Sequence, residues 1–231
     1  MKNIRKRIIK LIVSAIIVFF VSSTYTVMLF RFVNPPITIF MIYQYINGEH
    51  NVVVKEWRSI EEINPTLPLA IIASEDQNFL NHWGFDLKAI EKALANNSKN
   101  KRIRGGSTIS QQLAKNLFLI PTKSYVRKAL EGYFTILIEL LWNKKRTMEV
   151  YLNVVEYGEG VYGASAAAKM YFGKDASELN QKESSLIVTA LPNPIRYSLS
   201  RPSAYMYQRS HWVQRQMRNI GGVHLIKDWY E

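Results

Sequence analysis

The apolar positions divide the chain into an uncharged N-terminal run and a longer part with helical spacing. Residues 11–30 contain no charged side chain, whereas residues 1–10, MKNIRKRIIK, carry five positive charges and no acidic one. Twenty helical residues span about 30 Å, the thickness of the hydrocarbon core of a bilayer. Because cytoplasmic flanks are enriched in Lys and Arg, we expect a cytoplasmic tail over 1–10 and a transmembrane helix over 11–30.

A cleaved signal peptide is the alternative for this segment. Residues 11–20 could form its apolar region, and Val21-Ser22-Ser23 fits a cleavage site. The apolar run nevertheless continues through residues 27–30, and about 20 apolar residues are long for a signal peptide. We therefore favour a retained single-pass anchor, with the rest of the chain outside the cytoplasm.

The exported part is predicted to be mainly helical. From residue 67 onward, apolar residues recur every three or four positions, as in amphipathic helices, and Gly and Pro clusters separate the runs. We interpret 31–50 as a juxtamembrane linker and 51–231 as one domain, with a short extended piece within 52–60. The predicted helices are Leu69–Glu75, Leu87–Ala95, Ile109–Phe118, Tyr125–Trp142, Thr147–Val154, Gly163–Phe172, Gln181–Leu191 and Pro202–Asn219.

Within the linker, residues 37–46 are apolar and aromatic. They could lie in the membrane interface, where Tyr43 and Tyr45 suit the level of the lipid headgroups. An element packed on the domain explains the same pattern equally well.

Composition and charge narrow the chemistry. The absence of cysteine excludes disulfides and thiolate catalysis, and no two of the four histidines are spaced for a helical metal site. The net charge is +12, and residues 99–146 hold eleven basic and two acidic side chains. Such a basic centre suits a phosphorylated substrate or a lipid headgroup, and the exported location disfavours nucleic acid. A solvated helix face is the plainer explanation.

Three groups of residues carry candidate chemistry. Glu75 and Asp76 end the apolar helix 69–75, and a carboxylate at the negative end of a helix dipole suits a general base. A surface cap or ion pair is the commoner fate of a single glutamate. His82 follows at a fixed interval and would, on its own, be structural.

The second group follows Gly105-Gly106. Thr108 and Gln111 are spaced as a capping box, and the free N–H groups of a helix start favour an anion. Gln111 and Gln112 offer paired amides suited to sugar hydroxyls, and Lys115 supplies a point charge for a phosphate. An ordinary capped helix explains the glycines and Thr108, but it does not explain the glutamines and the lysine.

In the third group, Arg127 and Glu131 lie one helical turn apart and share a face with Lys128 nearby. A surface ion pair worth about 0.3–0.5 kcal/mol is the plain interpretation. The functional interpretation is a second carboxylate kept ionised by its cationic neighbours. Glycosyl chemistry uses two carboxylates in unlike environments.

Five motifs in this order resemble the peptidoglycan glycosyltransferase family, which includes the polymerase module of bifunctional penicillin-binding proteins and the monofunctional transglycosylases. The motifs are E-D-x-x-F-x-x-H-x-G (75–84), G-G-S-T-I-x-Q-Q-x-x-K-N (105–116), R-K-x-x-E (127–131), K-R-x-x-E-x-Y-L-N (145–153) and G-x-x-G-x-x-x-A-A-x-x-Y-F-G (160–173). The resemblance covers roughly residues 50–200. It implies a lysozyme-like, two-lobed α fold with a cleft facing the membrane.

The resemblance also implies the reaction and the roles of individual residues. The growing glycan chain on undecaprenyl diphosphate would be the donor and lipid II the acceptor, with Glu75 as general base on the 4-hydroxyl of the acceptor in an inverting attack. Glu131 would orient the cations or a metal. Lys115, Lys123, Arg127 and Lys128 would hold the diphosphate, and Asp76, His82, Ser107, Thr108, Gln111, Gln112 and Asn116 would position or contact the sugars.

The resemblance leaves several points open. No cofactor is expected, although Mg²⁺ or Mn²⁺ near Glu131 is permitted, and other cell-wall synthesis or division proteins are candidate partners. It places the anchor in the bacterial inner membrane and the domain in the periplasm. Position 123 is Lys where relatives often have Arg, and Leu130 stands where some carry Lys, so the phosphate contacts are less firmly assigned than Glu75.

A monofunctional polymerase is expected, because residues 98–101 match S-x-x-K without a following K-T-G and too few residues remain for a second domain. Two alternatives stay open from the sequence. A lytic transglycosylase or lysozyme could share the fold and the glutamate, and a membrane-anchored scaffold would need no catalytic residue.

Overall fold

The structure, a computed structural model, describes residues 2–47, 53–91 and 106–231. They are mainly helical, which confirms the predicted fold class, while the two-lobed arrangement stays a prediction. The α-helices are α1 (Lys2–Phe30), α2 (Ile39–Ile46), α3 (Thr66–Glu75), α5 (Ile109–Phe118), α6 (Tyr125–Leu141), α7 (Lys144–Val154), α8 (Ala164–Phe172), α9 (Gln181–Ile187) and α10 (Ala204–Asn219). The 3₁₀ segments are η1 (Ile60–Glu62), η2 (Ala176–Glu178), η3 (Val188–Ala190) and η4 (Gly222–Trp229).

The predicted helices are present with small shifts at their ends, such as α3 and α7, which each begin three residues earlier than expected, and two of them need separate comment. The helix expected over Gln181–Leu191 is instead α9 followed by η3, because the hydrogen-bond pattern tightens there, as it often does at helix ends. The helix expected over Leu87–Ala95 is present from residue 87 to 91, and its remaining residues lie outside the described ones.

A small sheet was only partly predicted. β1 (Val54–Lys55), β2 (Glu156–Gly158) and β3 (Val161–Tyr162) form a three-stranded sheet in the order β1-β3-β2. β3 pairs in parallel with β1 and antiparallel with β2. β1 lies within the segment expected to be extended, whereas β2 and β3 are too short to give an alternating pattern of apolar residues.

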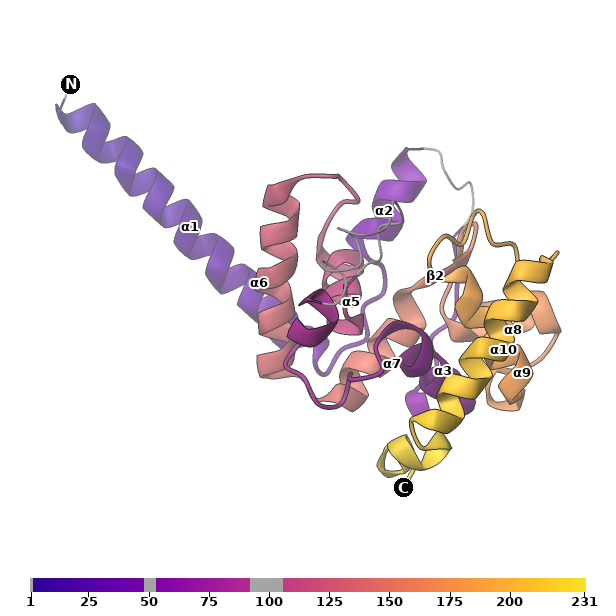
Figure 1. Cartoon of the computed structure of the whole chain (residues 1–231). Coiled ribbons are helices and arrows are strands. Elements are labelled where there is room, and N and C mark those ends of the chain that lie inside the picture. Colours follow the sequence, from indigo (N-terminus) through magenta and orange to yellow (C-terminus); the bar gives the residue numbers. More distant parts are fainter. Residues whose placement is uncertain (1, 48–52, 92–105) are drawn as a thin grey trace.

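α3 is a buried helix that carries Glu75 at its end. Residues 67–73 are all buried, as expected for a helix that is apolar on every side. α9 and α10 pack against α3 on one side of the molecule, and α5 packs against α2, α6 and α7 on the other (Figure 1). Glu75 is therefore held by the best-packed helix in the domain.

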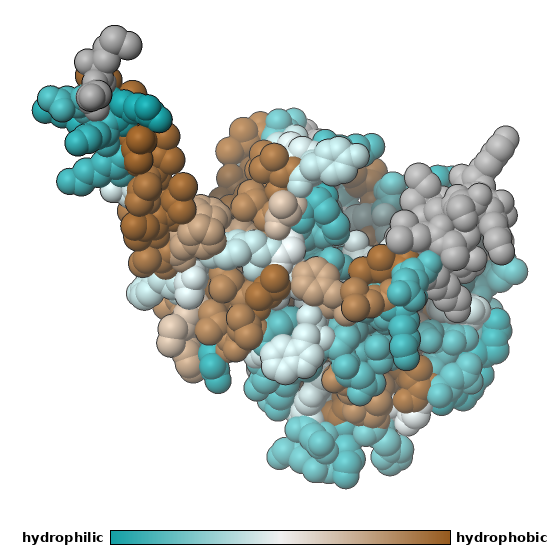
Figure 2. Space-filling model, turned by 60° about the vertical axis from the view of Figure 1, so that its left-hand side comes forward, coloured by the Kyte–Doolittle hydropathy of each residue, from teal (hydrophilic) through white to brown (hydrophobic). Residues whose placement is uncertain are grey.

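α1 is long and apolar enough to cross a membrane. It extends away from the body of the molecule, and its surface is apolar except near its basic N-terminus (Figures 1 and 2). Its last turns contact α6, where the Ser23 and Tyr133 hydroxyls lie 2.7 Å apart and the Trp142 indole N–H donates to the Val27 carbonyl at 2.8 Å. The end of the helix is thus docked on the domain.

Arg146 joins the end of α1 to α7. Its guanidinium group donates to the carbonyl of Phe30 (2.9 and 3.1 Å), to that of Val33 (3.0 Å) and to Asn34 Oδ1 (3.0 Å), and it pairs with Glu149. The last carbonyls of a helix have no partner within the helix, and a cation also suits the negative end of its dipole. The contacts fix the direction in which α1 leaves the domain.

We expect Arg146→Ala to lower the free energy of unfolding by about 2–3 kcal/mol, because several charge-assisted hydrogen bonds are lost and Glu149 is left unpaired. Lys145→Ala is the matched control. Lys145 pairs with the exposed Glu61 at 2.8 Å, and an exposed pair is worth at most about 1 kcal/mol. Thermal unfolding of both variants in detergent measures the difference. Equal losses of stability in the two variants would show that the contacts of Arg146 with the end of α1 contribute nothing specific.

α2 combines the two interpretations of residues 37–46. Met41 and Gln44 are buried and α2 packs on α5, so this element belongs to the domain. Its other face exposes Ile39, Ile42 and Tyr45. An exposed apolar helix face that follows the anchor in the sequence suits the membrane interface.

Candidate active site

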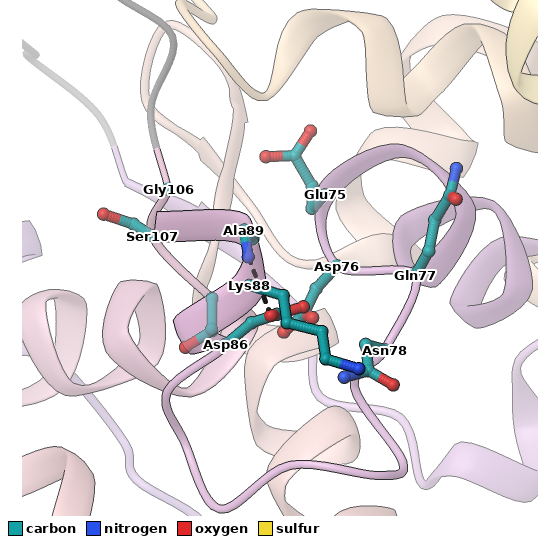
Figure 3. A pocket seen from close by; sticks show the side chains of 10 residues that line it. Glu75, Asp76, Gln77, Asn78, Asp86, Lys88, Ala89, Gly106 and Ser107 are labelled. Atoms are coloured by element: carbon teal, nitrogen blue, oxygen red, sulfur yellow. Dashed lines mark hydrogen bonds between the residues drawn. The ribbon is translucent and has the colours of Figure 1, made fainter. Parts of the chain in front are cut away.

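Glu75 lies on a cavity of about 370 Å³ between the end of α3 and the segments around residues 86–89 and 106–108. Glu75 and Asp76 leave the end of α3 in different directions (Figure 3). The Glu75 carboxylate accepts hydrogen bonds from the Ser74 hydroxyl at 3.1 Å and from the Gln112 amide at 3.1 Å. It is half-buried, fixed in place and open to a ligand in the cavity.

Asp76 and His82 bond to one another inside the domain. The His82 Nε2–H donates to the Asp76 carboxylate, with distances of 2.9 and 3.0 Å to its two oxygens. Asp76 Oδ2 also accepts the backbone N–H of Ile109, at 3.0 Å, where the positive end of the α5 dipole favours a negative charge. These contacts tie the first motif to the second and support a positioning role for both residues.

Hydrogen bonds also hold the start of α5 in place. Thr108 and Gln111 form the predicted capping box, which is confirmed, and the Thr108 hydroxyl donates to the Gly84 carbonyl at 2.6 Å. Gly84 has a φ of +76°, and a Cβ there would lie 2.6 Å from Thr135 Cγ2. The first motif therefore ends in glycine because no larger residue fits against α6.

Capping accounts for much of the second motif but not for all of it. The side-chain oxygen of Gln111 accepts the backbone N–H of Thr108 in the capping box, so Gln111 has a structural role. Ser107 is exposed and lines the cavity together with Glu75. Asn116 is buried near the end of α5. Of the sugar-contacting candidates on this segment, Ser107 and Gln112 lie nearest to the carboxylate.

A cluster of cations surrounds Glu131 on α6. Glu131 is buried, Arg127 Nη1 lies 2.5 Å from its Oε2, and Lys128 pairs with its Oε1. The ion pair expected from the spacing of Arg127 and Glu131 is confirmed. The sequence did not reveal that Glu131 is buried, and removing the partner of a buried charge costs more than removing that of an exposed one.

Lys115 on α5 belongs to the same cluster. Burial lowers its pKa below the usual lysine value; the positive charges of Arg127 and Lys128 lower it further, while Glu131 raises it. Lys115 follows Gln112 by three residues, a rise of about 4.5 Å along the helix axis. One helix thus presents an amide to Glu75 and, a turn later, an ammonium group to the Glu131 cluster.

The remaining predicted cations are not part of this cluster. Lys123 is exposed on the segment between α5 and α6. Lys99, Lys101, Arg102, Arg104 and Gly105 lie outside the described residues. Within the described part of the basic centre, three cations therefore gather around Glu131, whereas Lys144, Lys145 and Arg146 pair with other carboxylates, those of Glu139, Glu61 and Glu149.

A divalent cation at Glu131 does not fit the side chains present. Both carboxylate oxygens already bind cationic groups, and Mg²⁺ is held by several oxygen ligands. Within residues 2–47, 53–91 and 106–231, no group of three or more His, Asp or Glu side chains could hold a metal ion.

Three residues near Glu75 were not assigned a role from the sequence. Asp86 and Lys88 line the cavity, and Asp86 Oδ1 caps the following helix by accepting the Ala89 N–H at 2.9 Å (Figure 3). Tyr151, inside the fourth motif, donates to Gln112 Oε1 at 2.8 Å. An Asp before a helix start is a recognisable cap signal, whereas nothing local links Tyr151 to Glu75.

Comparisons with known proteins agree with this site. The sequence model of a family described as Transglycosylase matches residues 43–218. A biosynthetic peptidoglycan transglycosylase of Shewanella oneidensis is 48% identical, with 96% of each chain covered. Proteins of the same name from Pseudomonas putida (49% identity, 90% of each chain) and Xanthomonas campestris (46%, 94% of this chain and 90% of the relative) are also similar. The resemblance inferred from the five motifs is confirmed, and the chain belongs to the transglycosylase family.

Proposed function

We propose that the chain polymerises the glycan strands of peptidoglycan by inverting transfer of the growing, undecaprenyl-diphosphate-linked chain onto lipid II. The observation that carries this proposal is that α5 links two groups of opposite kind: its Gln112 contacts the half-buried Glu75 carboxylate, and one turn later its Lys115 joins the cations around the buried Glu131. A reaction between a sugar hydroxyl and a sugar diphosphate requires a base for the first and cations for the second.

In this reaction, Glu75 takes the proton of the acceptor 4-hydroxyl as its oxygen attacks C1 of the donor sugar. The bond from C1 to the diphosphate oxygen breaks, the configuration at C1 inverts, and undecaprenyl diphosphate leaves with the negative charge. Lys115, Arg127 and Lys128 stabilise that charge, and Glu131 holds the last two in place. Ser107 and Gln112 are positioned to contact the sugars, while Asp76, His82, Thr108 and Gln111 hold the site together.

The membrane arrangement follows from the same substrate. α1 serves as a single-pass anchor with its basic end in the cytoplasm, and the domain lies in the periplasm against the inner membrane. Apolar side chains are exposed on α2, which follows the anchor in the sequence, and at Ile136 and Leu140 of α6, which the anchor contacts. Such a surface supports a domain that rests on the bilayer, where lipid-linked donor and acceptor are both present.

Incubation of the purified full chain with lipid II tests the proposal. We expect a glycan polymer and release of undecaprenyl diphosphate. Cleavage of preformed glycan without polymerisation would instead identify a lytic enzyme, which has no need for cations that hold a diphosphate. A cellular role that survives loss of Glu75 would identify a scaffold.

The lowered pKa of Lys115 predicts a specific pH dependence. The ammonium form holds the phosphate, and it is lost as the pH rises through a pKa below the usual lysine value. We therefore expect the KM for lipid II to increase on the alkaline side, starting at a lower pH than an ordinary lysine would require. Lys115→Arg should flatten this increase, because guanidinium keeps its proton. Parallel KM profiles for the two proteins would contradict the assignment.

A further inference from the structure

Tyr151 is a buried hydroxyl that the mechanism above does not use. It lies on α7, its side chain is fully buried, and its hydroxyl donates to Gln112 Oε1 at 2.8 Å. The other end of the same amide, Gln112 Nε2, donates to Glu75 Oε2 at 3.1 Å. α7, α5 and α3 are thereby linked in a single chain of hydrogen bonds that ends on the proposed base.

We propose that Tyr151 is a positioning residue that sets the orientation of the Gln112 amide and so keeps Glu75 in the proton-accepting form. This inference rests on the proposed role of Glu75. An amide has a donor end and an acceptor end. With its oxygen occupied by the tyrosine hydroxyl, Gln112 presents N–H to the carboxylate, an arrangement that favours ionised Glu75.

The reverse orientation shows why the tyrosine matters. If the amide turned over, its oxygen would face Glu75, and two acceptors would meet unless the carboxyl group carried a proton. The Tyr151 hydroxyl opposes this rotation because it could then only accept from Gln112 Nε2, and its own buried proton would have no acceptor among the described residues. Hydrogen bonds in such a chain also polarise one another, so the bond from Gln112 to Glu75 is strengthened.

The surroundings keep Tyr151 a donor. Burial raises the pKa of Tyr151 well above its usual value, and the negative charges of Glu75 and Asp76, together with Tyr157, act in the same direction. The hydroxyl therefore stays protonated at neutral pH and below. Lys115 on α5 is the nearest cation on the helix that carries Gln112, and it is unchanged in the variants below.

Tyr151→Phe tests the proposal, with Tyr157→Phe as the matched control. Tyr157 is equally buried, and its hydroxyl has no hydrogen-bond partner among the described residues. The measurement is the pH dependence of kcat for lipid II polymerisation by the full chain in detergent. In Tyr151→Phe we expect the acid limb to move upward by about one pH unit with little change in KM. Tyr157→Phe should leave the profile in place.

A double-variant cycle separates this role from a packing effect. Because Tyr151 acts through Gln112, Tyr151→Phe should produce no further shift of the acid limb in a Gln112→Leu background. Any of three results would overturn the proposal. The first is an acid limb that does not move in Tyr151→Phe, the second is an equal movement of the limb in Tyr157→Phe, and the third is that Tyr151→Phe adds its full shift in the Gln112→Leu background. Full polymerisation activity in Glu75→Gln would instead contradict the proposed role of Glu75, on which the proposal for Tyr151 rests.

Discussion

Glu75→Gln should abolish glycan polymerisation while the chain remains folded. Glutamine has the shape of glutamate but cannot take the proton of the acceptor hydroxyl, and loss of a general base costs about 10²–10⁴ in rate. The Glu75 side chain is half-buried, and its partners Ser74 and Gln112 can still bond to an amide. Polymer formation from lipid II measures the rate, and circular dichroism with thermal unfolding measures the fold.

Glu159→Gln is the control for this variant. Glu159 is an exposed glutamate between β2 and β3, so its neutralisation removes the same charge without touching the cavity. We expect its activity to equal that of the unmodified chain. Clear turnover by Glu75→Gln in the same assay would mean that another group accepts the proton.

Glu131→Gln should have the second largest effect, on both stability and substrate binding. Removing the charge of Glu131 leaves Arg127 and Lys128 without their counter-ion, and because both cations are partly exposed to solvent the cost is about 1–2 kcal/mol of unfolding free energy. Three mutually repelling cations would then lose the geometry that holds the diphosphate. We expect kcat/KM for lipid II to fall about 100-fold, measured together with denaturant unfolding.

Glu183→Gln separates the two effects. Glu183 pairs with Lys174 at 2.7 Å at the start of α9 and is partly shielded from solvent, so its loss also lowers stability. It should leave kcat/KM unchanged. If Glu131→Gln lost stability and kept full kcat/KM, the cation cluster would be structural rather than substrate-binding.

The helical part of the fold was predictable because its signals are local. α5 begins and ends at the predicted residues, since a capping box starts it and its apolar face has a regular period. The ends of α6 and α10 were predicted to within two residues for the same reason. β2 and β3 contain three and two residues, and β3 also pairs with the distant β1, so no local period revealed them.

In the site, too, the local contacts were predictable and the long-range contacts were not. The pair Arg127–Glu131 and the cap Thr108–Gln111 follow from helical spacing and were predicted. The bonds from Gln112 to Glu75 and from Tyr151 to Gln112 join residues 37 and 39 positions apart. Arg146 reaches Phe30 across 116 positions. Such contacts depend on how the helices pack, and the motifs indicated only that these residues belong together.

Packing also explains why an ion pair that looks ordinary in the sequence matters. The spacing of Arg127 and Glu131 is that of many exposed helix pairs. This pair differs from them only because Glu131 is buried on α6, the helix that packs on α5, and burial is a property of the folded domain.

The most direct test is a structure of Glu75→Gln with lipid II bound in a membrane mimic. The account predicts that the acceptor 4-hydroxyl lies within hydrogen-bonding distance of the side chain at position 75. It also predicts that the donor diphosphate contacts Lys115 and Arg127 in the same groove. A diphosphate bound away from these cations, or an acceptor hydroxyl facing away from position 75, would contradict it.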